Sequence, residues 1–159
     1  MEFVTGFLDK LKLFKLNLLT HLEIIKNSYT LLTRRELPLS LDASLIRAFD
    51  KCPFPIASHD NSSEPLFNYA NHAALNLFKM TLNEMMGLPS RASALPVDQD
   101  ERSKILEQVT KYGFIEHYQG KRVASDQAIF YIQDATVWNL LDQEKKYYGQ
   151  AVIIFKTSN

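Results

Sequence analysis

The 159-residue chain contains one cysteine, Cys52, and therefore cannot form an internal disulfide. Such sparse cysteine usage is typical of a reducing compartment, and we expect a cytoplasmic protein. The longest apolar runs are about five residues, against the roughly 20 that a membrane-spanning helix requires. The N-terminus also lacks the positive cluster and uninterrupted apolar stretch of a secretory signal. We therefore expect no membrane span.

An excess of charge of either sign is also missing. Eighteen basic residues balance eighteen acidic ones. Such a chain lacks the broad positive field that supplies most non-specific affinity for nucleic acids, so we expect no direct nucleic-acid binding. The apolar fraction of 46% and the charged fraction of 23% are ordinary for a globular protein of one domain.

Motifs for catalysis or metal binding are absent from the sequence. The four histidines are scattered, with no pair at the spacing of a metal clip. There is no nucleophile elbow, phosphate loop or dinucleotide fingerprint. Ser58, His59 and Asp60 are adjacent in sequence, but successive strand residues point to opposite faces and do not form a triad. We expect no catalytic residue and no metal site, and the sequence identifies no cofactor.

The first 35 residues predict a long helix with one apolar stripe, which Pro38 terminates. The stripe recurs at spacings of three and four and consists of Phe7, Leu11, Phe14, Leu18, Leu22 and Ile25. Burying each of these side chains is worth roughly 1.5 to 3 kcal/mol, so the stripe requires a partner. We predict an N-terminal helical extension over 1–40 and a second unit over 41–159.

Short elements are predicted in the middle of the chain. Asp42 is expected to cap a helix over 43–50, and two short strands are expected near 56–58 and 66–69. Further helix starts are predicted from three capping residues, namely Asn71, Thr81 and Asp98.

The last third is rich in β-branched and aromatic residues. Segments 114–124, 129–141 and 146–156 predict three antiparallel strands joined by short turns. Strict alternation places Phe130 and Ile132 on the same face as Trp138. The last two strands are apolar on both faces, so each face needs a cover. The central helices can cover one face, and the N-terminal helix or a second subunit can cover the other.

This order of elements resembles that of PAS domains. The local sequence over 67–74 and 81–87 is similar to PAS segments in which a strand leads into helices. A narrower set, 28–29, 57–59, 67–71, 88–91, 135–139 and 149–151, resembles the PAS-related MEKHLA family. The resemblance implies an α+β fold, a PAS-like five-stranded antiparallel sheet with flanking helices, to which the apolar periodicity of the first 35 residues adds the N-terminal helical extension. It also implies a non-enzymatic sensory or interaction module.

In PAS folds the inner face of the sheet and the central helices enclose a ligand cavity. The candidate ligand-binding residues are Arg91, Tyr118, Arg122, Trp138, Asn139 and Gln150. Arg91 offers a planar fork suited to a carboxylate or phosphate; the alternative is an ion pair with a structural carboxylate. At most one of Trp138 and Asn139 lines the cavity, because strand neighbours face opposite sides; otherwise Trp138 is core and Asn139 a satisfied sheet residue.

The leading hypothesis is therefore a sensory module that binds a small-molecule ligand or a protein partner. We predict a homodimer formed through the N-terminal helix and the sheet. Two alternatives remain: a structural protein-interaction domain without ligand, and a small-molecule enzyme using the same cavity. Cys52 precedes the first strand and is outside the motif of flavin-binding light sensors, so a buried apolar role is favoured for it.

Overall fold

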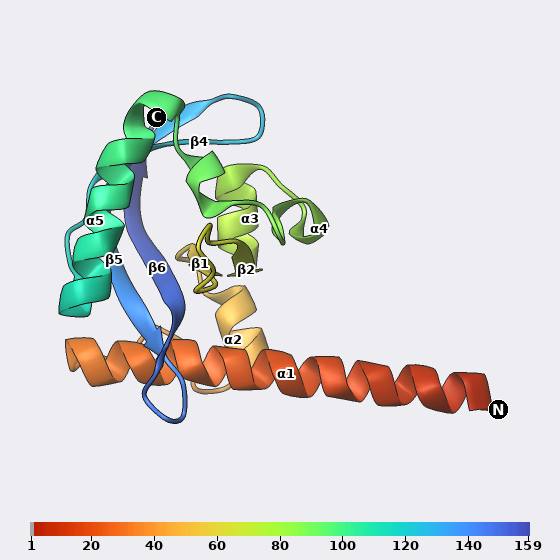
Figure 1. Ribbon diagram of the computed structural model, residues 1–159. Helices are drawn as coiled ribbons and strands as arrows, with labels where there is room; N and C mark the ends of the chain where they lie inside the picture. Colours follow the sequence, from red (N-terminus) through yellow and green to blue (C-terminus); the bar gives the residue numbers. More distant parts are fainter. Residues whose placement is uncertain (1) are drawn as a thin grey trace.

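The computed structural model describes residues 2–159, apart from the side chains of residues 2–5, 7, 11 and 16. The long helix α1 (Glu2–Thr33) and the short helix α2 (Leu45–Lys51) pack together on one side of an antiparallel sheet (Figure 1). The helices α3 (His72–Phe78) and α5 (Gln99–Tyr112) contribute to the core on the other side. The fold is of α+β class, as predicted. No helix among the described residues is both long enough and apolar enough to cross a bilayer.

The long helix covers the outer face of the sheet with its C-terminal half. Leu22, Ile25 and Tyr29 are buried in one cluster with Trp138 and Leu140 of the sheet. The cover that the doubly apolar strands require is thus supplied within the chain. Figure 1 shows the N-terminal part of α1 extending beyond the rest of the molecule.

The apolar stripe of α1 is only partly covered. Its side chains become progressively more buried from Phe14, which is 62% exposed, through the half-buried Leu18 to the fully buried Leu22. The predicted stripe positions Phe7 and Leu11 lie outside the described side chains.

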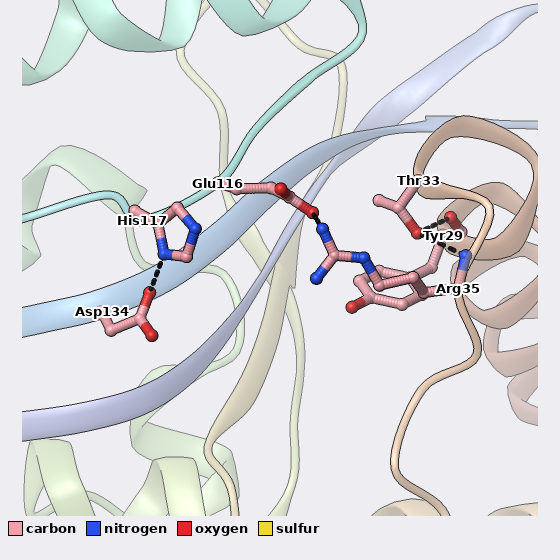
Figure 2. Close-up of polar contacts among 6 residues, drawn as sticks. All are labelled: Tyr29, Thr33, Arg35, Glu116, His117 and Asp134. Carbon is pink, nitrogen blue, oxygen red and sulfur yellow. Dashed lines mark hydrogen bonds and ion pairs between the residues drawn. The ribbon is translucent and has the colours of Figure 1, made fainter.

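Polar contacts fix the end of α1 to the segment that follows the short strand Phe114–Ile115 (Figure 2). The Thr33 hydroxyl donates to the Tyr29 carbonyl at 2.7 Å and accepts from the Arg35 amide at 3.2 Å. The Arg35 guanidinium pairs with the Glu116 carboxylate. The division of the chain near residue 40 stays a prediction.

The shorter helices are α2 (Leu45–Lys51), α3 (His72–Phe78), α4 (Leu82–Met85) and α5 (Gln99–Tyr112). Two 3₁₀ turns, Ser90–Ser93 and Pro96–Asp98, connect α4 to α5. The predicted caps Asn71 and Thr81 are confirmed, because their side chains accept from the amides of Ala74 and Glu84.

Two predicted caps are wrong. Ser44, rather than Asp42, caps α2 by accepting from the Arg47 amide at 3.4 Å. Asp98 precedes α5 but makes no capping bond. Its backbone is helical because a 3₁₀ turn runs directly into α5, whereas a capping side chain requires an extended backbone.

The sheet contains β1 (Ile56–His59), β2 (Phe67–Ala70), β3 (Phe114–Ile115), β4 (Gly120–Val123), β5 (Ile129–Leu141) and β6 (Tyr147–Ser158). The strand order is β2-β1-β6-β5-β3, with β4 also paired to β5. The predicted meander of consecutive antiparallel strands is therefore confirmed. The strand predicted over 114–124 is divided between β3 and β4, which gives six strands rather than five.

The division of that strand has a local cause. His117 adopts a left-handed backbone with a φ of 56°, and its ring bonds outward to Asp134 at 3.2 Å (Figure 2). Tyr118 then turns inward and is buried, while its amide still bonds to the Ala135 carbonyl at 2.8 Å. Residues 116–119 thus interrupt the strand and direct Tyr118 toward the interior.

One prediction about the faces of β5 is wrong. Phe130 and Ile132 belong to the inner core with Ala135 and Val137, whereas Trp138 belongs to the outer core against α1. The pairing of β5 with β6 is irregular on both sides of Asp134. An extra residue there shifts the alternation by one position, so side chains before and after it exchange faces.

Candidate functional site

A small inner cavity of about 60 Å³ lies between the inner face of the sheet and the helices α3 and α5. Its apolar lining includes Phe78, Ile132, Val137 and Ile154. Its polar lining includes His59, Ser93, Arg102, Tyr118, Arg122 and Gln150. Sites for drug-sized ligands measure about 300 to 1,000 Å³, whereas one water needs roughly 10 to 15 Å³. The inner cavity therefore has room for several waters or one small group.

Two buried arginines line this cavity. Arg102, on α5, and Arg122, on β4, are 9% and 8% exposed. Arg102 donates from Nη2 to the Ser90 hydroxyl at 3.1 Å, while its Nε is buried without a hydrogen-bond partner. Arg122 donates to the Lys121 carbonyl at 2.7 Å and to the Tyr118 hydroxyl. Among the described residues, neither arginine forms an ion pair with a carboxylate.

The arginines also line an outer cleft of about 580 Å³, which opens to solvent. Arg102, Tyr118, Arg122 and Ile132 are shared by the outer cleft and the inner cavity. Burial, reinforced by the positive charge of Arg122, lowers the pKa of Arg102 to about 10. The guanidinium remains charged at neutral pH, and the two cations stand together where the cleft meets the cavity.

His59 supplies a second unusual polar group. Its Nδ1 lies 2.9 Å from the Asp60 carbonyl, which can only accept, so Nδ1 carries the proton. Burial lowers the pKa of His59, and the ring is neutral at pH 7. Its Nε2 is then a bare acceptor that is buried without a hydrogen-bond partner, beside Gln150.

Gln150 and Asn139 join β5 and β6 to α5. The Gln150 amide nitrogen lies 3.1 Å from the Leu106 carbonyl, 2.9 Å from the Thr110 hydroxyl and 3.1 Å from Asn139 Oδ1. Asn139 donates to the Thr110 carbonyl at 3.1 Å. This network fixes α5, and with it Arg102, over the inner face of the sheet.

The structure brings three of the six predicted site residues to the inner cavity: Tyr118, Arg122 and Gln150. Trp138 lies on the opposite face, where its indole donates to the Ile25 carbonyl at 3.2 Å. Asn139 is on the inner face but is occupied by α5. Arg91 is exposed and pairs with Glu64 at 2.7 Å, which is the structural alternative weighed above. Ligand contact by any of the six stays a prediction.

Sequence reasoning missed Arg102 and His59. Arg102 precedes Ile105 and Leu106 by three and four residues, so it occupies the buried stripe of its helix. A charged residue on an otherwise apolar stripe is the signal that could have identified it.

A hydrogen-bonded pair, Ser58 and His21, lies on the other side of β1. Ser58 Oγ donates to Asn68 Oδ1 at 2.6 Å, and His21 Nε2 lies 2.9 Å from the same hydroxyl. Because the single hydroxyl proton is used toward Asn68, His21 Nε2 must donate. Its Nδ1 then accepts from the Tyr148 hydroxyl at 3.2 Å. In this arrangement His21 is not a base for Ser58, which argues against nucleophilic catalysis by the pair.

His21 predicts a loss of stability in acid. Burial lowers its pKa from 6.5 to about 4, so the unfolded chain binds this proton first as the pH falls. The free energy of unfolding should decline between pH 6.5 and pH 4, by about 3 kcal/mol from this residue. Urea denaturation at a series of pH values measures the decline. His21→Gln should flatten it, whereas His72→Gln, at an exposed position, should not; equal slopes in all three proteins would contradict the assignment.

Cys52 is buried in the outer core, and its thiol lies 3.7 Å from the Pro38 carbonyl. Burial raises the pKa of this thiol. The residue is absent from the lining of the inner cavity. Within the described part of the chain, no three His, Cys, Asp or Glu side chains are grouped so as to hold a metal ion.

The fold is shared with solved PAS structures. The PAS domain of a protein from Colwellia psychrerythraea is 17% identical, with a TM-score of 0.61 over 70% of this chain and 92% of that one. A light-oxygen-voltage domain studied with a flavin analogue is 19% identical, with a TM-score of 0.60 over 75% and 88%. An RNA-binding light-oxygen-voltage receptor is 18% identical, with a TM-score of 0.63 over 73% of this chain and 33% of the receptor.

These identities establish the fold alone. A search of curated protein sequences finds no match. The model of the MEKHLA domain, however, matches residues 19–159, which include the C-terminal half of α1, the whole sheet and the arginine pair. The chain therefore belongs to the MEKHLA domain family.

Proposed function

We propose that this MEKHLA domain is a non-enzymatic sensory module that binds a small ligand at the inner cavity and acts through self-association. The observation that carries the proposal is the set of buried, unpartnered polar atoms in that cavity, Arg102 Nε and His59 Nε2. Buried polar groups in native proteins are nearly always hydrogen-bonded. A bound ligand would supply the missing partners.

The decisive measurement is native mass spectrometry of freshly purified protein, which reports bound mass and oligomeric state together. A dimer carrying a stoichiometric small molecule is the expected result. A monomer without bound mass, unchanged after incubation with a mixed metabolite extract, would contradict the proposal.

Self-association is proposed through the projecting half of α1. Leu8, Leu13 and Phe14 are 48%, 57% and 62% exposed on this helix. Beside it, an apolar groove of about 730 Å³ runs from Phe14 and Leu18 to Met86, the residue that follows α4. A two-fold dimer can use both surfaces at once, because each helix can enter the groove of the other copy.

Phe14→Glu should therefore convert a dimer to a monomer. A charge placed in an apolar interface is left without a partner, whereas Phe14 is too exposed in the single chain for the change to unfold it. Light scattering at tens of micromolar measures the mass. The matched control is Leu41→Glu, which alters an apolar residue that is 92% exposed outside α1 and should remain dimeric. A wild type that is already monomeric refutes the dimer.

One observation favours the second hypothesis, a protein-interaction domain without ligand. The inner cavity measures about 60 Å³, and ordered waters alone can fill such a space. In that case the protein is a dimer without bound mass, and the exposed half of α1 is its functional surface.

A further inference from the structure

The two buried arginines share an environment that proteins rarely leave uncompensated. Each guanidinium is removed from most of its water, and a buried charge is normally paired with an opposite one. Among the described residues, the neighbouring charge that acts on Arg102 is that of Arg122, which is also positive and lowers the pKa of Arg102. Asp98 and Glu101 line the outer cleft, yet neither forms an ion pair with an arginine, and Asp98 Oδ2 is itself buried without a hydrogen-bond partner.

The remaining donors point to one kind of partner. Arg102 uses one of its five N–H groups on Ser90, and its Nε is buried without a partner. Arg122 donates to the Lys121 carbonyl and the Tyr118 hydroxyl, and these two hydrogen bonds hold its guanidinium group in place. Positioned guanidinium groups with unused N–H donors match the two oxygens of a carboxylate.

His59 adds a requirement of the opposite kind. Its Nε2 is an acceptor in the lining of the same cavity, with the Gln150 side chain beside it but no hydrogen bond of good geometry. A carboxylate has no proton to donate at neutral pH, so a second group on the ligand must do so. A hydroxyl near the carboxylate satisfies this requirement.

The volume of the inner cavity limits the size of the ligand. Beyond the arginines, the inner cavity of about 60 Å³ is walled by apolar side chains such as Phe78, Val137 and Ile154. A short hydrocarbon chain fits there, whereas a large ring system needs several hundred Å³.

We propose that Arg102 and Arg122 bind the carboxylate of a short-chain 2-hydroxy acid, whose hydroxyl donates to His59 Nε2 and whose short apolar end enters the inner cavity. This inference rests on the ligand-binding part of the proposed function, because it names the chemical class of the ligand.

Calorimetric titration of the full chain with four probes tests the chemistry. Lactate carries both groups, propionate lacks the hydroxyl, 1,2-propanediol lacks the carboxylate, and inorganic phosphate is an anion of another shape. Lactate should bind at least tenfold more tightly than each of the others. Phosphate or propanediol binding as tightly as lactate would overturn the carboxylate assignment, and equal affinity for propionate would overturn the role of His59.

Variants separate ligand binding from a structural role. Arg102→Met removes an uncompensated charge but preserves much of the side chain's volume. The melting temperature of the ligand-free variant should stay level or rise, while its affinity for lactate falls at least tenfold. Arg91→Met, which changes an arginine whose side chain is 61% exposed, should keep wild-type affinity. If Arg102→Met instead lowers the melting temperature and leaves lactate affinity unchanged, the arginine is structural and the inference fails.

Native mass spectrometry distinguishes failure of this inference from failure of the proposed function. A stoichiometric ligand that is neutral, in a protein that ignores lactate, would overturn the hydroxy acid and leave the sensory module standing. A protein that binds neither lactate nor any extract component, and is monomeric, would overturn both.

Discussion

Asn71→Ala is expected to lower the free energy of unfolding by about 4 kcal/mol or more, because four buried backbone groups lose their partner. Asn71 Oδ1 accepts from the amides of Ile56 at 2.9 Å and Ala74 at 3.0 Å. Its Nδ2 donates to the carbonyls of Phe49 and Phe54, both at 3.0 Å. The side chain is fully buried, so water cannot replace it.

Urea denaturation followed by tryptophan fluorescence measures this loss, since Trp138 is the only tryptophan and is fully buried. If Asn71→Ala does not fold, Asn71→Ser gives a second measurement, because the shorter side chain can retain the cap to Ala74 alone. The matched control is Thr81→Ala, which removes an exposed cap and should cost about 1 kcal/mol. A loss at Asn71 no greater than that at Thr81 would show that the buried network contributes little.

Asn71 also shows how far the sequence alone reaches. Its position before a helical pattern predicts the cap to Ala74, which is a local interaction. Its other three partners, Phe49, Phe54 and Ile56, lie 15 to 22 residues earlier in the chain. Nothing in a single sequence indicates that α2 and β1 come together at this amide. The local role was therefore predictable, and the tertiary role was not.

Some residues of the candidate site were also predictable from the sequence, and others were not. Gln150 was found because strand alternation and the family resemblance place the inner face of the meander at the cavity. Trp138 was placed on the same face of β5 as Phe130 and Ile132. This was wrong because strict alternation takes no account of the irregular pairing around Asp134. Arg91 was named as a candidate for its chemistry, with an ion pair as the favoured alternative, and its exposed side chain does pair with Glu64.

Arg102 was missed for a different reason. Charged side chains are solvent-exposed in most proteins, so the residue type of Arg102 alone gives no reason to place it inside. The size of the inner cavity is equally beyond the sequence, because it depends on how side chains such as Phe78, Leu106 and Ile154 pack together. The fold follows largely from pattern and family, whereas the chemistry of the site required side-chain positions.

The second large effect is expected from Gly149→Ala, on β6. Gly149 is buried at the point where β6 passes β1, and its φ of 156° is one that other residues rarely adopt. A Cβ at this position would lie 2.2 Å from the His59 carbonyl oxygen. That atom belongs to the backbone and cannot move by a rotamer change, so β1 must separate locally from β6. A glycine inside a strand often marks such a close approach.

We expect Gly149→Ala to lower the free energy of unfolding by about 3 kcal/mol, the upper range for overpacking, because the strand pairing itself is disturbed. Urea denaturation measures the change. Gly6→Ala is the matched control: this glycine lies in exposed helix with no neighbouring atom within 4 Å, so the same substitution should stabilise the chain by roughly 0.5 to 1 kcal/mol. Since His59 lines the inner cavity, Gly149→Ala should also weaken lactate binding, whereas Gly6→Ala should not. Equal stability of the two variants would mean that β1 and β6 tolerate a methyl group between them, and that the position of His59 is less constrained than its contacts imply.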